Sequence, residues 1–204
     1  GYIDKQVTVT ESGMADVTVE YDMFTDNSGQ TNLANQNSTT EKITWKDGNI
    51  TKNIDITTKQ KYNNVYAKAH FDPFNLTGGD TRLTINLQFE GGKSARIDLN
   101  ITTNYGEGKV QSTGWDTFFG GWDDNKGTRL TADELNFIKT NGVDFTLVRN
   151  GAEVLIYIND VLKCNYTLTV KDGFDYATKP AALNIQYCQD QEHSNRFGFT
   201  LDIR

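Results

Sequence analysis

The stretch Leu83-Thr-Ile-Asn-Leu-Gln-Phe-Glu-Gly-Gly-Lys-Ser-Ala-Arg-Ile-Asp-Leu-Asn-Ile101 decides the fold class. Apolar and polar residues alternate on both sides of Gly91-Gly92. Because successive side chains of a strand point to opposite faces, each half predicts a strand with one apolar and one polar face. Two glycines suit the tight turn between them. The stretch therefore predicts an antiparallel hairpin with one face on a core.

The same period-two alternation runs along most of the 204 residues. Asp47-Gly48 predicts a hairpin that joins strands around Ile43 and Ile54. Asn150-Gly151 and Asn159-Asp160 predict two further turns, between strands that follow each other closely in the chain.

One short helix is expected where Thr131 and Glu134 form a capping box ahead of Leu135 and Ile138. No repeat or linker interrupts the pattern. We therefore expect an all-β, two-sheet antiparallel sandwich with one short helix, and residues 1–204 are expected to form a single domain.

The charge and hydropathy of the chain exclude several classes of partner. A net charge of −7 argues against nucleic acid and anionic membrane surfaces, which require a basic face. No apolar stretch is long enough to cross a membrane, so no membrane insertion is expected. The first residues lack the pattern of a signal peptide, so any such peptide would precede Gly1. We expect an extracellular or cell-surface protein.

Two cysteines, Cys164 and Cys188, leave two alternatives open. A disulfide between them would close a loop of about two dozen residues and contribute roughly 3 kcal/mol. Two buried thiols are the other interpretation. Two cysteines are too few for a zinc site or a disulfide framework.

The segment from Asp144 to Lys163 resembles the paired strands of concanavalin-like (laminin-G-like) jelly rolls. It departs from their pattern at Val161, where that family usually has glycine. The resemblance implies two packed antiparallel sheets, which are commonly used to bind glycans, as in bacterial carbohydrate-binding modules. It does not fix a ligand, because the fold also hosts glycosidases and protein-binding modules.

The glycosidases of this fold carry a Glu-x-Asp-x-x-Glu strand, which this sequence lacks. The nearest candidates are Glu90 and Asp98, on the two strands of the main hairpin, where they would act as acid and base if their faces coincided. The competing interpretation is that both are solvated sheet residues. His70 and His193 are the only histidines, and no serine motif accompanies them. We therefore expect no enzymatic activity.

Alternation predicts a polar outer face on the strands 65–71, 83–89 and 97–101. Its amide, carboxylate and guanidinium groups, with one phenol ring and one imidazole, suit the hydroxyls and the C–H face of a sugar. A merely solvated sheet face is the alternative. The predicted ligand-binding residues on this face are Tyr66, His70, Asn86, Gln88, Arg96, Asp98 and Asn100.

A second candidate is the glycine-rich segment 114–127. Trp122, and next Trp115, are the predicted sugar-stacking residues; alternatively, the aromatic side chains of this segment close one end of the sandwich. Asp123, Asp124 and Asn125 offer oxygen ligands on a turn that ends in glycine, which predicts a structural calcium site. An ordinary Asx turn is the competing interpretation.

The sequence-based hypothesis is a non-catalytic carbohydrate-binding module, a monomeric part of a larger secreted or surface protein, that binds a polysaccharide or other glycan. A protein-binding adhesin or structural domain is the first alternative, and a glycoside hydrolase is the second.

Overall fold

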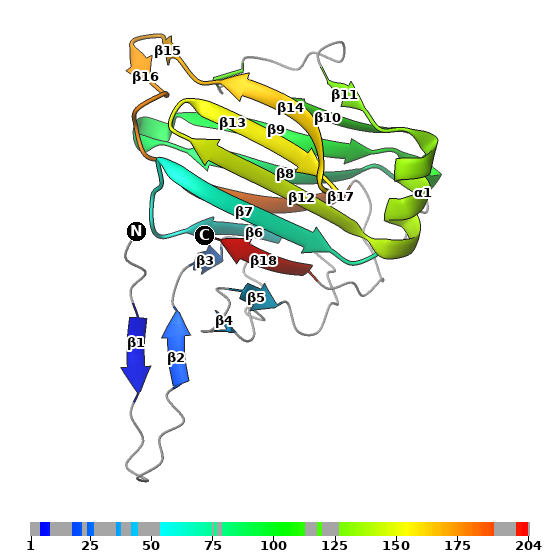
Figure 1. Ribbon diagram of the computed structural model, residues 1–204, viewed down its shortest axis with the longest axis horizontal. Coiled ribbons are helices and arrows are strands. Elements are labelled where there is room, and N and C mark those ends of the chain that lie inside the picture. The colour runs from blue at the N-terminus through cyan, green and yellow to red at the C-terminus, as the bar shows by residue number, and fades with distance from the viewer. Residues whose placement is uncertain are drawn as a thin grey trace.

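The protein is a sandwich of two antiparallel seven-stranded sheets in the computed structural model (Figure 1). The structure describes residues 54–74, 76, 79–112, 118–119, 127–189 and 199–203, and the backbone of five short strands between residues 5 and 44. This architecture confirms the expected all-β sandwich.

The first sheet, called here the β8 sheet, carries the hairpin that decides the fold. Its strands, in spatial order, are β11 (Thr128–Arg129), β10 (Gly108–Ser112), β9 (Ser94–Ile101), β8 (Thr81–Gln88), β17 (Ala182–Gln189), β6 (Ile54–Thr58) and β3 (Phe24–Asp26).

The second sheet, called here the β12 sheet, packs against it. Its strands, in spatial order, are β14 (Val161–Thr167), β13 (Glu153–Ile158), β12 (Val143–Asn150), β7 (Asn64–Phe71), β18 (Phe199–Ile203), β5 (Lys42–Thr44) and β4 (Gln36–Asn37). Two small ribbons, β1 (Lys5–Thr8) with β2 (Thr18–Tyr21) and β15 (Val170–Lys171) with β16 (Phe174–Asp175), lie outside the sheets.

The core fills the space between the sheets with the apolar set of each strand. Leu83, Ile85 and Leu87 of β8 have no exposed surface, and the same holds for Ile97 and Leu99 of β9. Burial of a side chain of this size contributes about 1.5–3 kcal/mol to the free energy of unfolding. The apolar side chains that the alternation directs inward are therefore what mainly holds the two sheets together.

Three of the four predicted turns are confirmed. β8 and β9 pair across η1 (Glu90–Gly92), where Gly91 and Gly92 have φ of +66° and +72°. β12 pairs with β13, and β13 with β14, as the turns at 150–151 and 159–160 predict. The hairpin expected at Asp47-Gly48 is wrong, because β5 and β6 belong to different sheets.

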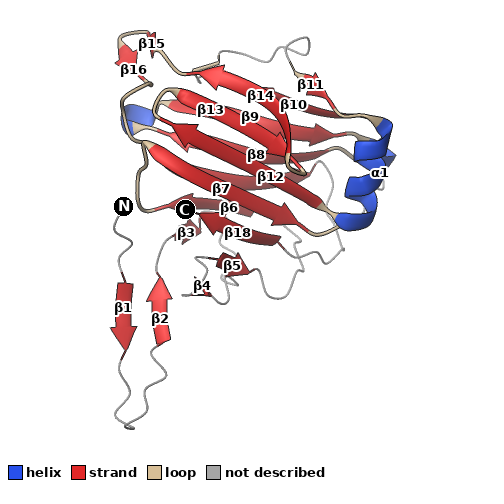
Figure 2. Cartoon of the chain, viewed as in Figure 1, coloured by secondary structure: helices blue, strands red, loops and turns tan. Residues whose placement is uncertain are grey.

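The one described α-helix, α1 (Ala132–Asn141), lies at one end of the sandwich (Figure 2). Its capping box is confirmed: the Thr131 hydroxyl accepts from the Glu134 amide, and the Glu134 carboxylate accepts from the Thr131 amide. The helix ends at Gly142, whose φ is +82° and where a Cβ would lie 2.2 Å from the Phe71 carbonyl oxygen. Helix α1 is too short to cross a membrane, and no other α-helix is described.

Arg149 is buried in the interior although it carries a charge. It is 1% exposed, and its guanidinium donates to the carbonyls of Gly151, Tyr62, Tyr176 and Lys179 at 2.7–3.1 Å. Its central carbon lies 5.3 Å from the centre of the Phe89 ring. Burial lowers the pKa of Arg149. The side chain therefore fastens the segment 176–179 to the β12 sheet.

Cys164 carries a free, buried thiol, so it does not form the disulfide that was one of the two alternatives. It lies on β14 of the β12 sheet, whereas Cys188 lies on β17 of the β8 sheet.

Candidate functional site

The predicted polar face divides between the two sides of the sandwich. β7 pairs with β12 and β18, so it belongs to the β12 sheet, whereas β8 and β9 lie in the β8 sheet. Tyr66 and His70 therefore lie on one outer face of the sandwich, and Asn86 and Arg96 lie on the opposite outer face. The expectation of one shared face is wrong, because alternation fixes the side of a strand but not the sheet that the strand joins.

The outer face of the β8 sheet holds the larger polar set. Its strands are in register, so polar residues form rows that cross it. One row follows the pairs Gln111–Asp98, Asp98–Thr84, Thr84–Gln186 and Gln186–Asp55. The next row, with the same strand order, contains Arg96, Asn86, Asn184 and Thr57.

Polar side chains on this outer face are as buried as the core. Asp98 and Thr84 have no exposed surface, Asn184 is 1% exposed, Gln111 3% and Asn86 8%. Buried polar groups are costly unless they are hydrogen-bonded, so a cluster of this kind requires partners.

Asp98 lies at the centre of this face and is held from two sides. Its Oδ1 atom accepts from the Thr84 hydroxyl at 2.5 Å and from Arg96 Nε at 3.0 Å. Charge-assisted hydrogen bonds of this type fix the orientation of a carboxylate.

Other polar atoms of this face are buried without a hydrogen-bond partner. Five of the eight such atoms in the described part of the chain lie here: Arg82 Nε, Asn86 Oδ1, Arg96 Nη2, Asn100 Nδ2 and Gln111 Oε1. They include donors and acceptors and surround Asp98 in the register of β8, β9 and β10. Unpartnered polar atoms that share a face mark a place where an external hydrogen-bonding molecule gains contacts.

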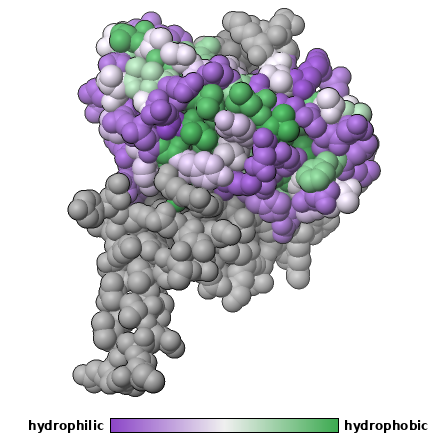
Figure 3. All heavy atoms as spheres, in the orientation of Figure 1, coloured by the Kyte–Doolittle hydropathy of each residue, from purple (hydrophilic) through white to green (hydrophobic). Residues whose placement is uncertain are grey.

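The outer face of the β12 sheet, which Figure 3 views, is of a different kind. Its middle is apolar (Figure 3). Val148 of β12 lies opposite Leu155 of β13 in this sheet. The charged groups gather to one side: Asp144 accepts from His70 Nδ1 at 2.6 Å and pairs with Lys68 Nζ at 2.9 Å.

The cluster of Lys68, His70 and Asp144 is internally satisfied. Burial would raise the pKa of Asp144, but hydrogen bonds from Lys68 and His70 outweigh it, and the pKa lies below its ordinary value. The hydrogen bond to Asp144 in turn raises the pKa of Lys68. Because these charges neutralise one another, this side offers little for a ligand to gain, and the β8 face is the stronger candidate.

The structure does not bring Glu90 and Asp98 together. Glu90 is an exposed residue of the turn η1 and pairs with Lys179 at 2.9 Å. Asp98 lies opposite Thr84, six residues back along the partner strand, which is about 20 Å at the usual rise of a strand. The pair therefore does not form an acid–base couple.

The predicted residues of segment 114–127 lie largely outside the described residues. Trp115, Trp122, Asp123, Asp124 and Asn125 belong to the part that the structure does not describe, so stacking and calcium binding stay predictions. In the described ranges, no group of three or more His, Cys, Asp or Glu side chains could hold a metal ion.

Phe118 and Phe119, the two described aromatic residues of this segment, close one end of the sandwich, as the alternative interpretation held. Phe118 lies 5.0 Å, ring centre to ring centre, from Tyr176, and Phe119 lies 4.7 Å from Tyr166. Both pack against the core.

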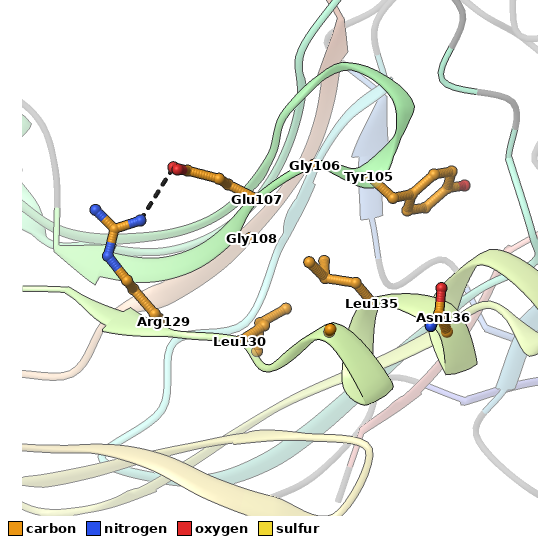
Figure 4. Close-up of a pocket in the computed structure, with 9 residues that line it drawn as sticks. Tyr105, Gly106, Glu107, Gly108, Arg129, Leu130, Leu135 and Asn136 are labelled. Carbon is orange, nitrogen blue, oxygen red and sulfur yellow. Dashed lines mark hydrogen bonds and ion pairs between the residues drawn. The ribbon is translucent and has the colours of Figure 1, made fainter.

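A small pocket lies between α1 and the start of β10 (Figure 4). Leu130 and Leu135 line it, and an ion pair of 3.0 Å joins Arg129 to Glu107. Its volume of about 170 Å³ is below the 300–1,000 Å³ usual for ligand sites. Tyr105 also lines it, but its hydroxyl donates to the Phe74 carbonyl, and burial raises its pKa to about 12. The pocket is therefore a weaker candidate than the β8 face.

Sequence reasoning missed several residues of the β8 face, among them Thr84, Arg82, Asn184 and Gln111. Thr84 and Arg82 alternate with the same leucines as Asn86 and were available to the pattern. Asn184 lies between two apolar residues of the closing strand, so the same alternation points it outward. Gln111 lies on β10, in a segment whose glycines interrupt the alternation that would have predicted a strand.

Comparisons with known proteins agree on the fold. No protein-family model and no curated protein sequence matches the chain. Among solved structures, the Crh5 transglycosylase matches with a TM-score of 0.54 at 11% identity, over 98% of this chain and 82% of that one.

Two glucanases match in a similar way. SCLam, a non-specific endo-β-1,3(4)-glucanase from family GH16, gives a TM-score of 0.54 at 10% identity over 89% of this chain and 82% of that one. The β-glucanase of Bacillus licheniformis gives 0.50 at 9% identity over 88% of this chain and 89% of that one.

These matches correct the sequence-based hypothesis of a non-catalytic module without enzymatic activity. The proteins whose fold this chain shares are mainly glycan-cleaving or glycan-transferring enzymes rather than binding modules. The missing Glu-x-Asp-x-x-Glu strand was too narrow a criterion, because a motif defined on one group of enzymes says nothing of carboxylates placed otherwise. At these identities, what is shared is the architecture: the chain has a concanavalin-like jelly-roll fold.

Proposed function

We propose that the protein is a carbohydrate-active enzyme that cleaves or transfers glycan chains, with the glycan on the outer face of the β8 sheet. The observation that carries this proposal is the buried carboxylate of Asp98, surrounded by buried polar atoms that lack partners. Sugar hydroxyls are both donors and acceptors, so a glycan satisfies both kinds of atom at once.

Asp98, which has no exposed surface in the free protein, would act on the reacting sugar once the polar side chains around it have moved aside. Cleavage of a glycosidic bond passes through a positively charged, oxocarbenium-like state, which a fixed carboxylate stabilises. The hydrogen bonds from Thr84 and Arg96 hold Asp98 in place before substrate arrives, so the carboxylate itself need not reorient during the reaction.

Asp55 would contact a neighbouring sugar. It lies in the same row as Asp98 but three strands away, about 14 Å at the usual strand spacing. Paired catalytic carboxylates lie roughly 5–9.5 Å apart, so the two residues do not serve one bond. Asp55 accepts from the Asn184 amide at 2.6 Å, which fixes it as a polar contact at the far end of the row.

Release of new chain ends tests the proposal. The purified protein is incubated with a panel of plant, microbial and host polysaccharides, and products are separated by size and assayed for reducing ends, so that both hydrolysis and transfer are detected. Asp98→Asn is expected to lower the rate at least a hundredfold. Glu90→Gln, an exposed carboxylate remote from the face, serves as control and is expected to retain full activity.

Two results would count against the proposal. One is the absence of any product from the whole panel; the other is an Asp98→Asn variant as active as the wild type. A secreted or cell-surface location is part of the same proposal, since large polysaccharides are met outside the cell.

A further inference from the structure

Two cations of the β8 face form no ion pair with the described residues. Its other two arginines are paired, Arg96 with Asp98 and Arg129, which lies opposite Lys109, with Glu107. Arg82 and Lys109 have no acidic partner in the described part of the chain. Two cations without an acidic partner among the described residues thus lie on one face of a chain whose net charge is −7.

These two cations belong to one row. Lys109 of β10 lies opposite Asn100 of β9, and Asn100 lies opposite Arg82 of β8. Strands are spaced by about 4.8 Å, so the backbones of Arg82 and Lys109 are about 10 Å apart with the Asn100 side chain between them. We call these three residues the cationic row.

The row presents donors that have no acceptor. Arg82 Nε and Asn100 Nδ2 are both buried and unpartnered. An unsatisfied guanidinium nitrogen is among the most costly buried groups, and a planar anion with two oxygens satisfies it best, through paired N–H···O bonds.

The cationic row adjoins the proposed reacting position. Asn100 and Asp98 are two residues apart on the same face of β9, about 7 Å. A substituent on the sugar next to the reacting one would therefore reach the row while Asp98 serves the bond.

We propose that the substrate is an acidic glycan, and that Arg82, Asn100 and Lys109 bind its carboxylate or sulfate group. This inference rests on the proposed site on the β8 face, but it has its own readout, because binding is measured separately from cleavage.

The experiment compares anionic glycans with their neutral counterparts. Polygalacturonate is compared with its carboxyl-reduced form, and chondroitin sulfate with its desulfated form, by affinity electrophoresis and by assay of new chain ends. The wild type is expected to bind at least one anionic form at least tenfold more tightly than its neutral partner, and to lose this preference in high salt. The first pair detects carboxylate recognition and the second sulfate recognition.

Variants assign the effect to the row. Lys109→Gln is expected to weaken binding of the anionic form about tenfold and to leave the neutral form unchanged. Arg82→Gln, which also alters the polar set around Asp98, is expected to weaken binding of the anionic form more than that of the neutral form. Lys179→Gln removes an equal charge at an exposed ion pair with Glu90 and is expected to change neither. Thermal unfolding of each variant confirms that it is folded, and Lys109→Gln keeps the test valid if Arg82→Gln is not.

Equal binding of each anionic glycan and its neutral partner by the wild type would overturn the inference. If chain ends were still released from a neutral glycan, the proposed activity would stand and only the substrate class would fall. Row-dependent binding of an acidic glycan without any cleavage would support the cationic row and count against the proposed reaction.

Discussion

Thr84 and Asp98 face each other across β8 and β9, and the threonine hydroxyl donates a 2.5 Å hydrogen bond to the buried carboxylate. Both side chains point away from the core and yet neither is exposed. Each of these two groups needs the other as a hydrogen-bond partner, because neither side chain is accessible to water.

Substitution of Thr84 tests this dependence. Thr84→Val keeps the shape and removes the donor, so the free energy of unfolding is expected to fall by about 1.5–3 kcal/mol, the contribution of a hydrogen bond to a charged group. Urea denaturation measures the change. On the proposed function, the rate of glycan cleavage falls as well.

Thr146→Val is the matched control. Thr146 is 3% exposed on the β12 sheet, and its hydroxyl is buried without a partner. The same substitution there is expected to be neutral or stabilising, since it removes an unsatisfied polar atom. Equal losses of stability in the two variants would show that the Thr84 hydrogen bond contributes nothing specific.

Arg149→Met is expected to destabilise the protein by about 3–5 kcal/mol. The change leaves the carbonyls of Gly151, Tyr62, Tyr176 and Lys179 without their donor in a buried place. Arg129→Met removes an arginine that is 65% exposed, and its expected effect is within about 1 kcal/mol. Chemical denaturation of both variants provides the comparison, and similar values for the two would contradict the structural role of Arg149.

The pH dependence of stability follows from Asp144. Its pKa is lower in the folded protein than the ordinary value of 3.8, because hydrogen bonds from Lys68 and His70 favour the charged form over the effect of burial. The folded state therefore binds fewer protons, and the resulting stabilisation is present above pH about 4 and is lost as the pH falls through the folded-state pKa.

Asp144→Asn checks this sign. The wild type is expected to be more stable than the variant at pH 7, and the difference is expected to shrink below pH about 4. Asp160→Asn removes the other carboxylate near Lys68, but Asp160 is 80% exposed, so little change is expected at any pH. A difference between wild type and Asp144→Asn that grows on acidification would refute the assignment.

Thr131→Ala tests the helix. The change removes the hydroxyl that accepts from the Glu134 amide, and a loss of about 1 kcal/mol in unfolding free energy is expected. Thr140→Ala, near the exposed end of the same helix, is expected to change stability by less than half as much. The prediction fails if the two substitutions have equal effects in thermal unfolding.

Local features of the fold were predictable from the sequence. The alternation of leucine and isoleucine on either side of Gly91-Gly92 predicts a hairpin, because both the side-chain period and the turn are encoded within a few residues. The capping box at Thr131 and Glu134 is local in the same sense.

The assignment of strands to sheets was not predictable in this way. His70 pairs with Asp144, 74 residues further along the chain, and no local pattern specifies that partner. For this reason the sequence-based interpretation placed His70 beside Asn86. It also joined the strands around Asp47-Gly48 into a hairpin, although they enter different sheets.

The burial of the candidate site could not be predicted from the sequence either. Alternation places Asn86 and Asp98 on the outer side of their strands, and an outer position is normally solvated. That Asp98 is inaccessible there depends on the packing of rows across β10, β9, β8 and β17, which only the three-dimensional register reveals.

The positions of β17 and β18 have a consequence for the order of folding. β17 lies between β8 and β6, and β18 lies between β7 and β5, although both strands come late in the chain. During synthesis, each sheet therefore consists of two separate halves until its late strand has left the ribosome. We therefore expect the sheets to close late in folding. Such non-local pairing slows folding in general and leaves unpaired strand edges open to aggregation or to a chaperone until it is complete.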